Sequence, residues 1–227
     1  ELLRSENFLH LLDNGQPYLD KPPLIFWVTA LFFKVFGASD FVYRMPSVLF
    51  SLIAIYATYH FSRLYYSSRT ALAAALILAS CQAFFIMNAD VRTDIYLIAP
   101  MMVSIWKISA YLKNGEWSSL LIGFVAVGFA MMGKGPQGMM IPILVFGFDL
   151  LLKRRLLQLV DIKLLLGLGV IALSLLPMSY GLYTQFGVKG LKFFYWTQSF
   201  GRITGASNWS NDIGPFYLFN VFLYAFL

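Results

Sequence analysis

The sequence has 227 residues, of which 59% are hydrophobic, 18% aromatic and only 12% charged. An ordinary soluble domain carries about 25% charged residues, so this composition excludes a self-contained soluble globule and favours a protein embedded in a bilayer. The net charge of +6 does not indicate a nucleic-acid partner, because the basic residues flank apolar runs, as Lys and Arg do at the ends of membrane spans. The single cysteine, Cys81, excludes a disulfide within the chain.

Residues 1–44 are predicted to form an outer first-loop segment that precedes the first membrane span. Within it, Pro22–Phe36 is apolar and aromatic, but it is too short to cross a bilayer, contains Lys34 and begins with two prolines. We therefore expect an amphipathic helix that lies at the membrane interface.

Residues 45–227 are predicted to form an all-α, polytopic transmembrane helical bundle of about seven spans. The apolar runs are Met45–Tyr65, Ala71–Ala89, Ile95–Leu112, Trp117–Met132, Met139–Leu152, Leu164–Tyr183 and Phe216–Leu227. A spanning helix needs about 17–25 residues, so the first three runs and the sixth qualify by length. The fourth and fifth are shorter, which indicates either two thin or tilted spans or a hairpin whose tip, Gly133–Pro136, dips into a cavity. Because the last run is truncated, we expect a C-terminal part of the full protein to be absent.

The density of basic residues predicts the orientation of the bundle. Lys153, Arg154 and Arg155 are consecutive and lie between two apolar runs, and such clusters stay on the cytoplasmic side of a membrane. This orientation brings four other segments together on the outer face, namely Glu1–Arg44, Asp90–Asp94, Lys134 and Thr184–Gly214.

That outer face collects the ionisable residues that do not anchor the inner loops. Asp20 and Lys21 precede the rigid pair Pro22-Pro23, which restricts the backbone on both sides. The others are Asp90, Arg92 and Asp94 in a short loop, and Lys134 and Arg202. Ionisable groups at a membrane boundary are costly unless they are paired or used, so each of these residues is a functional candidate.

The order of several short motifs carries a family resemblance. Lys21-Pro22-Pro23-Leu24 is followed by Phe26-Trp27, Phe36-Gly37 and Arg44-Met45-Pro46-Ser47, and later by Thr93-Asp94, Lys134-Gly135-Pro136 and Phe200-Gly201-Arg202. Over its whole length the sequence resembles the membrane glycosyltransferases of the GT-C superfamily. It is most similar in these motifs to the bacterial aminoarabinose transferases of lipid A and to the protein O-mannosyltransferases.

The resemblance implies a GT-C-like helical fold and an activity. A sugar would pass, with inversion, from a polyprenyl-phosphate donor to a lipid A-like lipid, a protein or a glycan at the outer face. The location implied is the bacterial inner membrane, with the active site facing the periplasm. On the positions that match the family's motifs, Asp94 is the candidate catalytic residue. The candidates for binding the donor phosphate are Lys21, Arg92, Lys134 and Arg202, because cations stabilise the charge that develops on a departing phosphate. We expect Lys21 and Asp94 to be neighbours across one cavity, since an acid beside a cation is less costly there than either alone.

Two departures from the family pattern are visible. In the family an Asp-Glu pair precedes the segment that matches Glu1–Ser5, so the principal catalytic acid is expected upstream of residue 1. Some relatives also bind a divalent metal with the acid before the two prolines and a later histidine. Asp20 matches that acid, but Thr197 and Gln198 stand at the later position, so only half of the ligand pattern is present. The sequence shows no requirement for a cofactor.

Two other functions remain open at this level. A transporter or flippase of polyprenyl-linked sugars would also need basic residues for a phosphate, but it would place ionisable residues near the middle of the bilayer on broken helices. A non-catalytic membrane subunit is the second alternative.

Overall fold

The computed structural model describes residues 2–5, 7–154, 162–198 and 216–226. The elements of this part are α1 Leu2–Ser5, β1 Leu12–Asp13, β2 Gln16–Pro17, α2 Leu24–Phe36, α3 Asp40–Tyr65, α4 Ser68–Ser80, α5 Gln82–Ala89, α6 Thr93–Asn114, α7 Trp117–Lys134, α8 Gln137–Leu152, α9 Ile162–Phe186, α10 Val188–Lys192, the π-helical turn η2 Phe193–Thr197, and α12 Tyr217–Phe226. The prediction of an all-α membrane bundle is confirmed.

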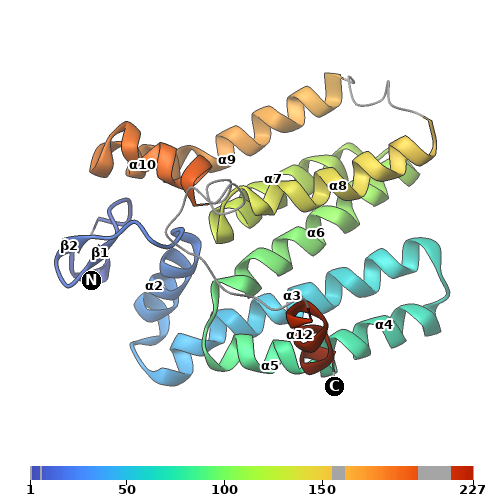
Figure 1. Ribbon diagram of the computed structural model, residues 1–227, viewed down its shortest axis with the longest axis horizontal. Helices are drawn as coiled ribbons and strands as arrows, with labels where there is room; N and C mark the ends of the chain where they lie inside the picture. The colour runs from blue at the N-terminus through green and yellow to red at the C-terminus, as the bar shows by residue number, and fades with distance from the viewer. Residues whose placement is uncertain (1, 6, 155–161, 199–215, 227) are drawn as a thin grey trace.

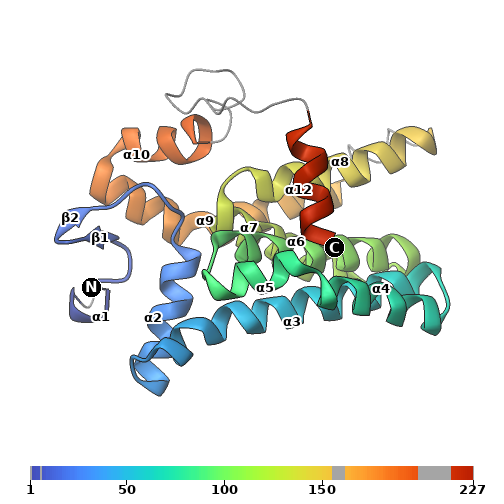
Figure 2. The ribbon, with the colours of Figure 1, turned by 60° about the horizontal axis from the view of Figure 1, so that its bottom comes forward.

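The long helices α3, α6, α7, α8 and α9 extend along the molecule. The helix α2 and the short hairpin of β1 and β2 lie at one end (Figures 1 and 2).

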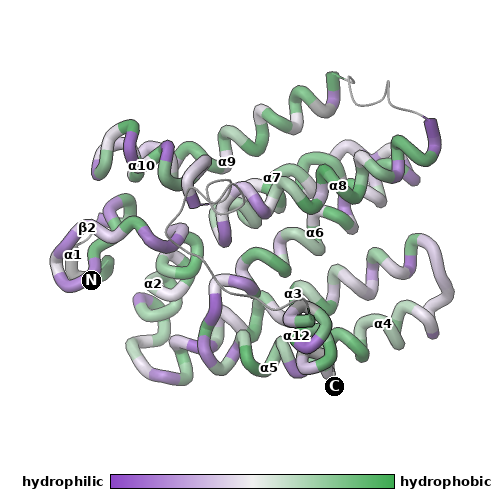
Figure 3. The backbone as a smooth tube through the Cα atoms, in the orientation of Figure 1, coloured by the Kyte–Doolittle hydropathy of each residue, from purple (hydrophilic) through white to green (hydrophobic). Residues whose placement is uncertain are grey.

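Four of the described helices are long and apolar enough to cross a membrane, namely α3, α6, α7 and α9. The helices α4 and α5 together give a fifth candidate span. The helices α8 and α12 have 16 and 10 residues, fewer than a straight span needs. The described residues therefore carry four or five candidate spans, fewer than the seven apolar runs of the sequence. Figure 3 shows apolar residues along the lengths of these helices and polar residues mainly near their ends.

The length of the apolar run Ala71–Ala89 predicts one continuous helix. The structure contains two helices there instead, α4 and α5, which are bent by 47° relative to each other. At the break Cys81 has an extended backbone, and its N–H donates to the carbonyl of Leu78. The hydroxyl of Ser80 donates to the carbonyl of Ile77 at 3.1 Å. Side chains that bond to nearby carbonyls compete with the regular helical pattern. After the bend, Phe84 of α5 is buried in the core.

The helix α7 is longer than the apolar run that predicted it. It continues through Gly133 to Lys134 and reaches 18 residues, so it qualifies as a span. The turn to α8 follows at once, since Gly135 has φ +79° and Pro136 precedes α8. The tip Gly133–Pro136 is thus partly the end of α7 rather than an extended hairpin loop.

The chain alternates between two ends of the bundle, which we call the near end and the far end. The near end holds α2 and the turns from α5 to α6 and from α7 to α8, whereas the far end holds the turns from α3 to α4 and from α6 to α7 (Figures 1 and 2). The far-end turn at Gly115 has the left-handed backbone that commonly ends a helix. This arrangement agrees with the predicted grouping of Asp94 and Lys134 at one end and Lys153 at the other.

One buried cluster joins the near end to the middle of the bundle. Leu24 and Ile25 of α2 pack in the same cluster as Ile95 of α6 and Met132 of α7, together with residues of α3, α5, α9 and η2. Leu24 and Ile95 are 2% and 0% exposed. The helix expected in this segment is present as α2: Leu24 and Ile25 at its start are buried, while Leu31, Val35 and Phe36 are exposed. Its place at the membrane interface stays a prediction.

Candidate functional site

The segment Asp20-Lys21-Pro22-Pro23 is held rigidly at the start of α2. Both prolines are buried, whereas Asp20 and Lys21 are exposed. Pro23 lies at the N-cap position of α2, where the missing N–H of a proline costs no helical hydrogen bond. The Lys21 ammonium is therefore carried by a backbone with little conformational freedom.

A contact distant in sequence fixes the same segment from the other side. The side-chain amide of Gln198, just after η2, donates a hydrogen bond to the backbone carbonyl of Asp20. The hydroxyl of Tyr18 donates to the carboxylate of Asp20 at 3.5 Å. Burial of Tyr18, and next the charges of Asp20 and Asp13, raise the pKa of its phenol. Tyr18 thus stays protonated and remains a donor to Asp20.

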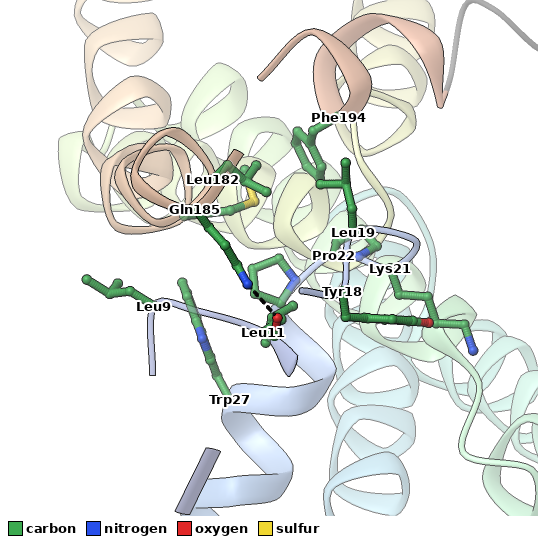
Figure 4. A pocket seen from close by; sticks show the side chains of 12 residues that line it. Leu9, Leu11, Tyr18, Leu19, Lys21, Pro22, Trp27, Leu182, Gln185 and Phe194 are labelled. Atoms are coloured by element: carbon green, nitrogen blue, oxygen red, sulfur yellow. Dashed lines mark hydrogen bonds between the residues drawn. The ribbon is translucent and has the colours of Figure 1, made fainter. Parts of the chain in front are cut away.

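An apolar pocket lies beside this segment (Figure 4). Lys21 and Pro22 line one part of it, and Leu9, Trp27 and Leu182 line another. Figure 4 shows the side chain of Lys21 extending past Tyr18, with the ammonium pointing away from the apolar residues. Within the described ranges, no carboxylate forms an ion pair with Lys21. The charge of Lys21 is therefore accessible next to an apolar surface.

The N-terminal segment is tied to this pocket by two hydrogen bonds. Trp27 donates through its indole nitrogen to the carbonyl of Phe8 at 2.5 Å, and the amide of Gln185 in α9 donates to the carbonyl of Leu11 at 2.8 Å. Close packing adds to this, because a Cβ on Gly181 would lie 2.4 Å from the carbonyl oxygen of Leu9. The pocket wall is thus built from the N-terminal segment, α2 and α9.

The second polar feature is an ion pair between α6 and α7. The ammonium of Lys134 donates to the carboxylate of Asp94, and both side chains are about one third exposed, at 36% and 33%. Asp94 lies in the first turn of α6 and Lys134 in the last turn of α7. Each charge therefore also interacts favourably with the dipole of its own helix.

Close backbone packing sets this pair. A Cβ on Gly133 would lie 2.4 Å from the carbonyl oxygen of Tyr96, so the end of α7 rests directly on the backbone of α6. Only glycine permits that approach without displacing one of the helices. The ion pair is consequently placed by the packing of two rigid helices and not by a loop.

The rigid segment and the ion pair lie at the same end of the bundle. Leu24, three residues after Lys21, shares a buried cluster with Ile95, which follows Asp94, and with Met132, which precedes Lys134 by two. The helix α2 contacts both α6 and α7. The described ion-pair partner of Asp94 is Lys134, and the expectation that Lys21 and Asp94 are neighbours across one cavity stays a prediction.

The other candidate residues have different positions. Arg92 donates through two nitrogens to one carboxylate oxygen of Asp90, at 3.1 and 2.8 Å, and both side chains are more than half exposed. Between them Val91 is buried with φ +48°, a left-handed backbone that is unusual for a β-branched residue. Arg202 lies outside the described residues.

The described residues were expected to offer Asp20 as one ligand of a metal site. Among residues 2–5, 7–154, 162–198 and 216–226, no three His, Cys, Asp or Glu side chains lie close enough together to hold a metal ion. Gln198 directs an amide N–H at Asp20, and an amide N–H is a donor rather than a ligand. A metal role for Asp20 therefore stays an untested expectation.

Known proteins match this chain in sequence and in structure. Residues 20–180, more than half of the chain, match the family described as dolichyl-phosphate-mannose-protein mannosyltransferase. An undecaprenyl phosphate-alpha-4-amino-4-deoxy-L-arabinose arabinosyl transferase of Pseudomonas aeruginosa is 27% identical over 84% of the chain and 35% of its own length. The corresponding enzyme of Photorhabdus laumondii is 24% identical over 89% of the chain and 37% of its own length.

Two solved structures share the fold. The crystal structure of ArnT from Cupriavidus metallidurans bound to undecaprenyl phosphate has a TM-score of 0.84 and 22% identity, and covers 99% of this chain and 42% of that one. The structure of the same protein in the apo state has a TM-score of 0.80 and 20% identity, and covers 99% of this chain and 41% of that one. The chain spans about a third to a half of the length of the curated relatives that it matches. By the family match over residues 20–180, this chain belongs to the dolichyl-phosphate-mannose-protein mannosyltransferase family and is a multi-pass membrane protein of the GT-C fold.

Proposed function

We propose that the full-length protein containing this chain is a membrane glycosyltransferase that takes its sugar from a polyprenyl-phosphate donor, with inversion. The relatives support the donor class, since they are named undecaprenyl phosphate-alpha-4-amino-4-deoxy-L-arabinose arabinosyl transferases. The structural neighbour bound to undecaprenyl phosphate supports it as well. We propose a hydroxyl or phosphate of a lipid A-like lipid, a protein or a glycan as the acceptor, and the bacterial inner membrane, with the site facing the periplasm, as the location.

One observation carries the proposal. An accessible ammonium, Lys21, lies beside an apolar pocket, and a second ammonium, Lys134, is held by Asp94 at the same end of the bundle. A polyprenyl-phosphate donor needs both properties, an apolar surface for its chain and cations for its phosphate. Both ammonium groups are held on rigid backbone, so they need no rearrangement as charge develops on the leaving phosphate.

The roles that we propose follow from the contacts. Lys21 binds the donor phosphate directly. Lys134 has three N–H donors, and the bond to Asp94 uses one, which leaves others for the phosphate. Asp94 orients Lys134 instead of removing a proton from the acceptor, because its carboxylate already accepts from that ammonium. We assign the base to the acid expected upstream of residue 1. Arg202 is proposed as a further phosphate ligand, while Arg92 is already engaged by Asp90.

The transporter alternative has less support in the structure. A broken span could hold a substrate at mid-bilayer, and α4 with α5 is a candidate for such a span. Its residues 71–89 contain no Asp, Glu, Lys, Arg or His, so the break offers no charged group for a phosphate. The ionisable pair Asp94–Lys134 lies at helix ends instead.

The experiment uses full-length protein in proteoliposomes, with a polyprenyl-phosphate donor whose sugar is radiolabelled. Transfer of label into an added lipid or peptide acceptor, detected after extraction, supports the glycosyltransferase. Movement of labelled donor to the opposite leaflet without covalent transfer contradicts it. Neither transfer nor movement, from protein that still binds the donor, would favour the non-catalytic subunit.

A further inference from the structure

A cluster of aromatic and basic side chains lies on α3 and α6 toward the far end, away from the candidate site. The ring of His60 stacks on Trp106, with centroids 4.9 Å apart and an interplanar angle of 26°. Tyr56 makes an edge contact with the same indole at 5.8 Å. The ammonium of Lys107 lies 4.2 Å from the centroid of Trp106. With Arg63, these residues form what we call the far-end cluster.

The cluster lies within the candidate spans and not in a loop. Lys107 precedes the end of α6 at Asn114 by seven residues, which is about 10 Å at 1.5 Å per residue. His60 precedes the end of α3 at Tyr65 by five residues, about 7.5 Å. This is the depth at which long basic side chains and amphipathic rings reach the headgroup region of one leaflet.

The positive charge of the cluster has no acidic partner in the part of the chain that the structure describes. Neither Lys107 nor Arg63 forms an ion pair there, and both lie close enough to His60 to act on it electrostatically. The described carboxylates at this end are engaged elsewhere. Asp149 binds Lys153 at 2.7 Å, and Glu116 accepts from Ser119 at 3.3 Å. Charge at a membrane boundary is costly without a counter-charge, so binding of an anion would stabilise Lys107 and Arg63 of the far-end cluster.

The surface around the cluster is apolar and open. Tyr56 is 57% exposed, and Leu52 and Ile53, one turn earlier on α3, are exposed as well. These side chains are exposed in the described part of the chain, and we take this apolar face of α3 to contact lipid. An anion that reaches this cluster must therefore bring an apolar body with it, as a phospholipid does and a free inorganic ion does not.

We propose that Tyr56, His60, Arg63, Trp106 and Lys107 form a binding site for the phosphate of an anionic phospholipid in the far-end leaflet. Lys107 and Arg63 supply the charge, and His60 supplies a ring N–H. Trp106 and Tyr56 contact the glycerol and upper acyl chains, as aromatic rings do at the membrane interface. The site is separate from the donor-phosphate site and does not depend on the proposed activity.

The test measures lipid retention by native mass spectrometry of the full-length protein released from mixed vesicles of phosphatidylglycerol and phosphatidylcholine. Wild-type protein should retain phosphatidylglycerol preferentially. Lys107→Gln should lower the affinity for phosphatidylglycerol about tenfold, because it removes a charge-assisted hydrogen bond. Lys107→Arg should keep the preference. Added inorganic phosphate should not displace the lipid.

Lys153→Gln is the matched control, since it removes one positive charge from the same end but from a lysine that already has an acidic partner. It should leave retention unchanged. Equal loss in Lys107→Gln and Lys153→Gln would overturn the proposal, because it would indicate only a general surface charge. Absence of any preference in wild-type protein, as expected if an acid elsewhere in the full-length chain neutralises the cluster, would overturn it as well. Size-exclusion profiles of each variant separate lost binding from lost folding.

Discussion

The ammonium of Lys134 donates a hydrogen bond to the carboxylate of Asp94, although forty positions separate the two residues. The helices α6 and α7 are joined by a tight turn at the far end and run back along each other, so the start of one meets the end of the other. The contact therefore follows from helix length and direction. It also places a fixed cation at the end of the bundle that carries Lys21.

The first prediction concerns this pair. Asp94→Ala and Lys134→Ala should each lower kcat, with Lys134→Ala costing on the order of 10²–10³. Because the two residues act together, the double variant should be no worse than Lys134→Ala alone. A double-mutant cycle on the full-length enzyme measures this coupling. The control is the exposed pair Asp149–Lys153 at the far end, whose removal should change activity little. Strict additivity of the two single effects would argue against an orienting role for Asp94.

The second prediction concerns the glycine beneath the pair. Gly133→Ala should destabilise the protein by about 1–3 kcal/mol, because the new Cβ would lie 2.4 Å from the carbonyl oxygen of Tyr96 and would push α7 from α6. Gly147→Ala is the control within α8, since nothing lies within 4 Å of its Cβ position and alanine favours a helix. Thermal unfolding in detergent should separate the two variants. Similar melting temperatures for both would show that the close approach is not required.

The sequence predicted the helical bundle, and the grouping of Asp94 and Lys134 at one end of it, better than it predicted the contacts. Apolar runs gave the spans because they are local features, and the two prolines after Lys21 predicted the start of α2. The bend at Cys81 lies beside a hydrogen bond from Ser80 to the carbonyl of Ile77, and the apolar character of the run does not predict either feature. The ion pair of Asp94 with Lys134 was not predicted, because it depends on where two helices end relative to one another. Gly133, a glycine directly before the charged residue Lys134, is a sequence feature that could have indicated the close approach of α7 to α6.

The third prediction concerns the contact between Gln198 and Asp20. Gln198→Glu replaces an N–H donor by a carboxylate oxygen that faces the backbone carbonyl of Asp20. The segment before Pro22 should become more mobile. We expect kcat/KM for the donor to fall about tenfold, because one hydrogen bond is lost and the new carboxylate is repelled by the carbonyl oxygen of Asp20. Thr197→Ala is the control, since its hydroxyl bonds to the carbonyl of Lys192 and not to this segment. Unchanged kcat/KM in Gln198→Glu would show that the prolines alone fix Lys21.

A fourth prediction concerns alkaline stability. Burial raises the pKa of Tyr195, whose hydroxyl lies 2.7 Å from that of Ser179. A phenol with a raised pKa in the folded state holds its proton longer than in the unfolded state, so its contribution is complete below about pH 10 and is lost as the pH rises through the folded value. Stability of the wild type should fall above pH 10, and Tyr195→Phe should flatten that decline. Parallel pH profiles for the two proteins would exclude Tyr195 as the cause.

The most direct test of the account is the turnover of Lys21→Ala in the full-length enzyme at saturating polyprenyl-phosphate donor. Lys34→Ala, in the last turn of the helix α2 that Lys21 precedes, is the matched control. We expect Lys21→Ala to express and insert normally but to lose about 10²–10³ in kcat, because a preorganised cation acts mainly on the charge of the transition state. Lys21→Arg should recover only part of that loss, since a planar guanidinium does not replace a compact ammonium. Near-normal turnover of Lys21→Ala, equal to that of Lys34→Ala, would contradict the assignment of Lys21 to the donor phosphate.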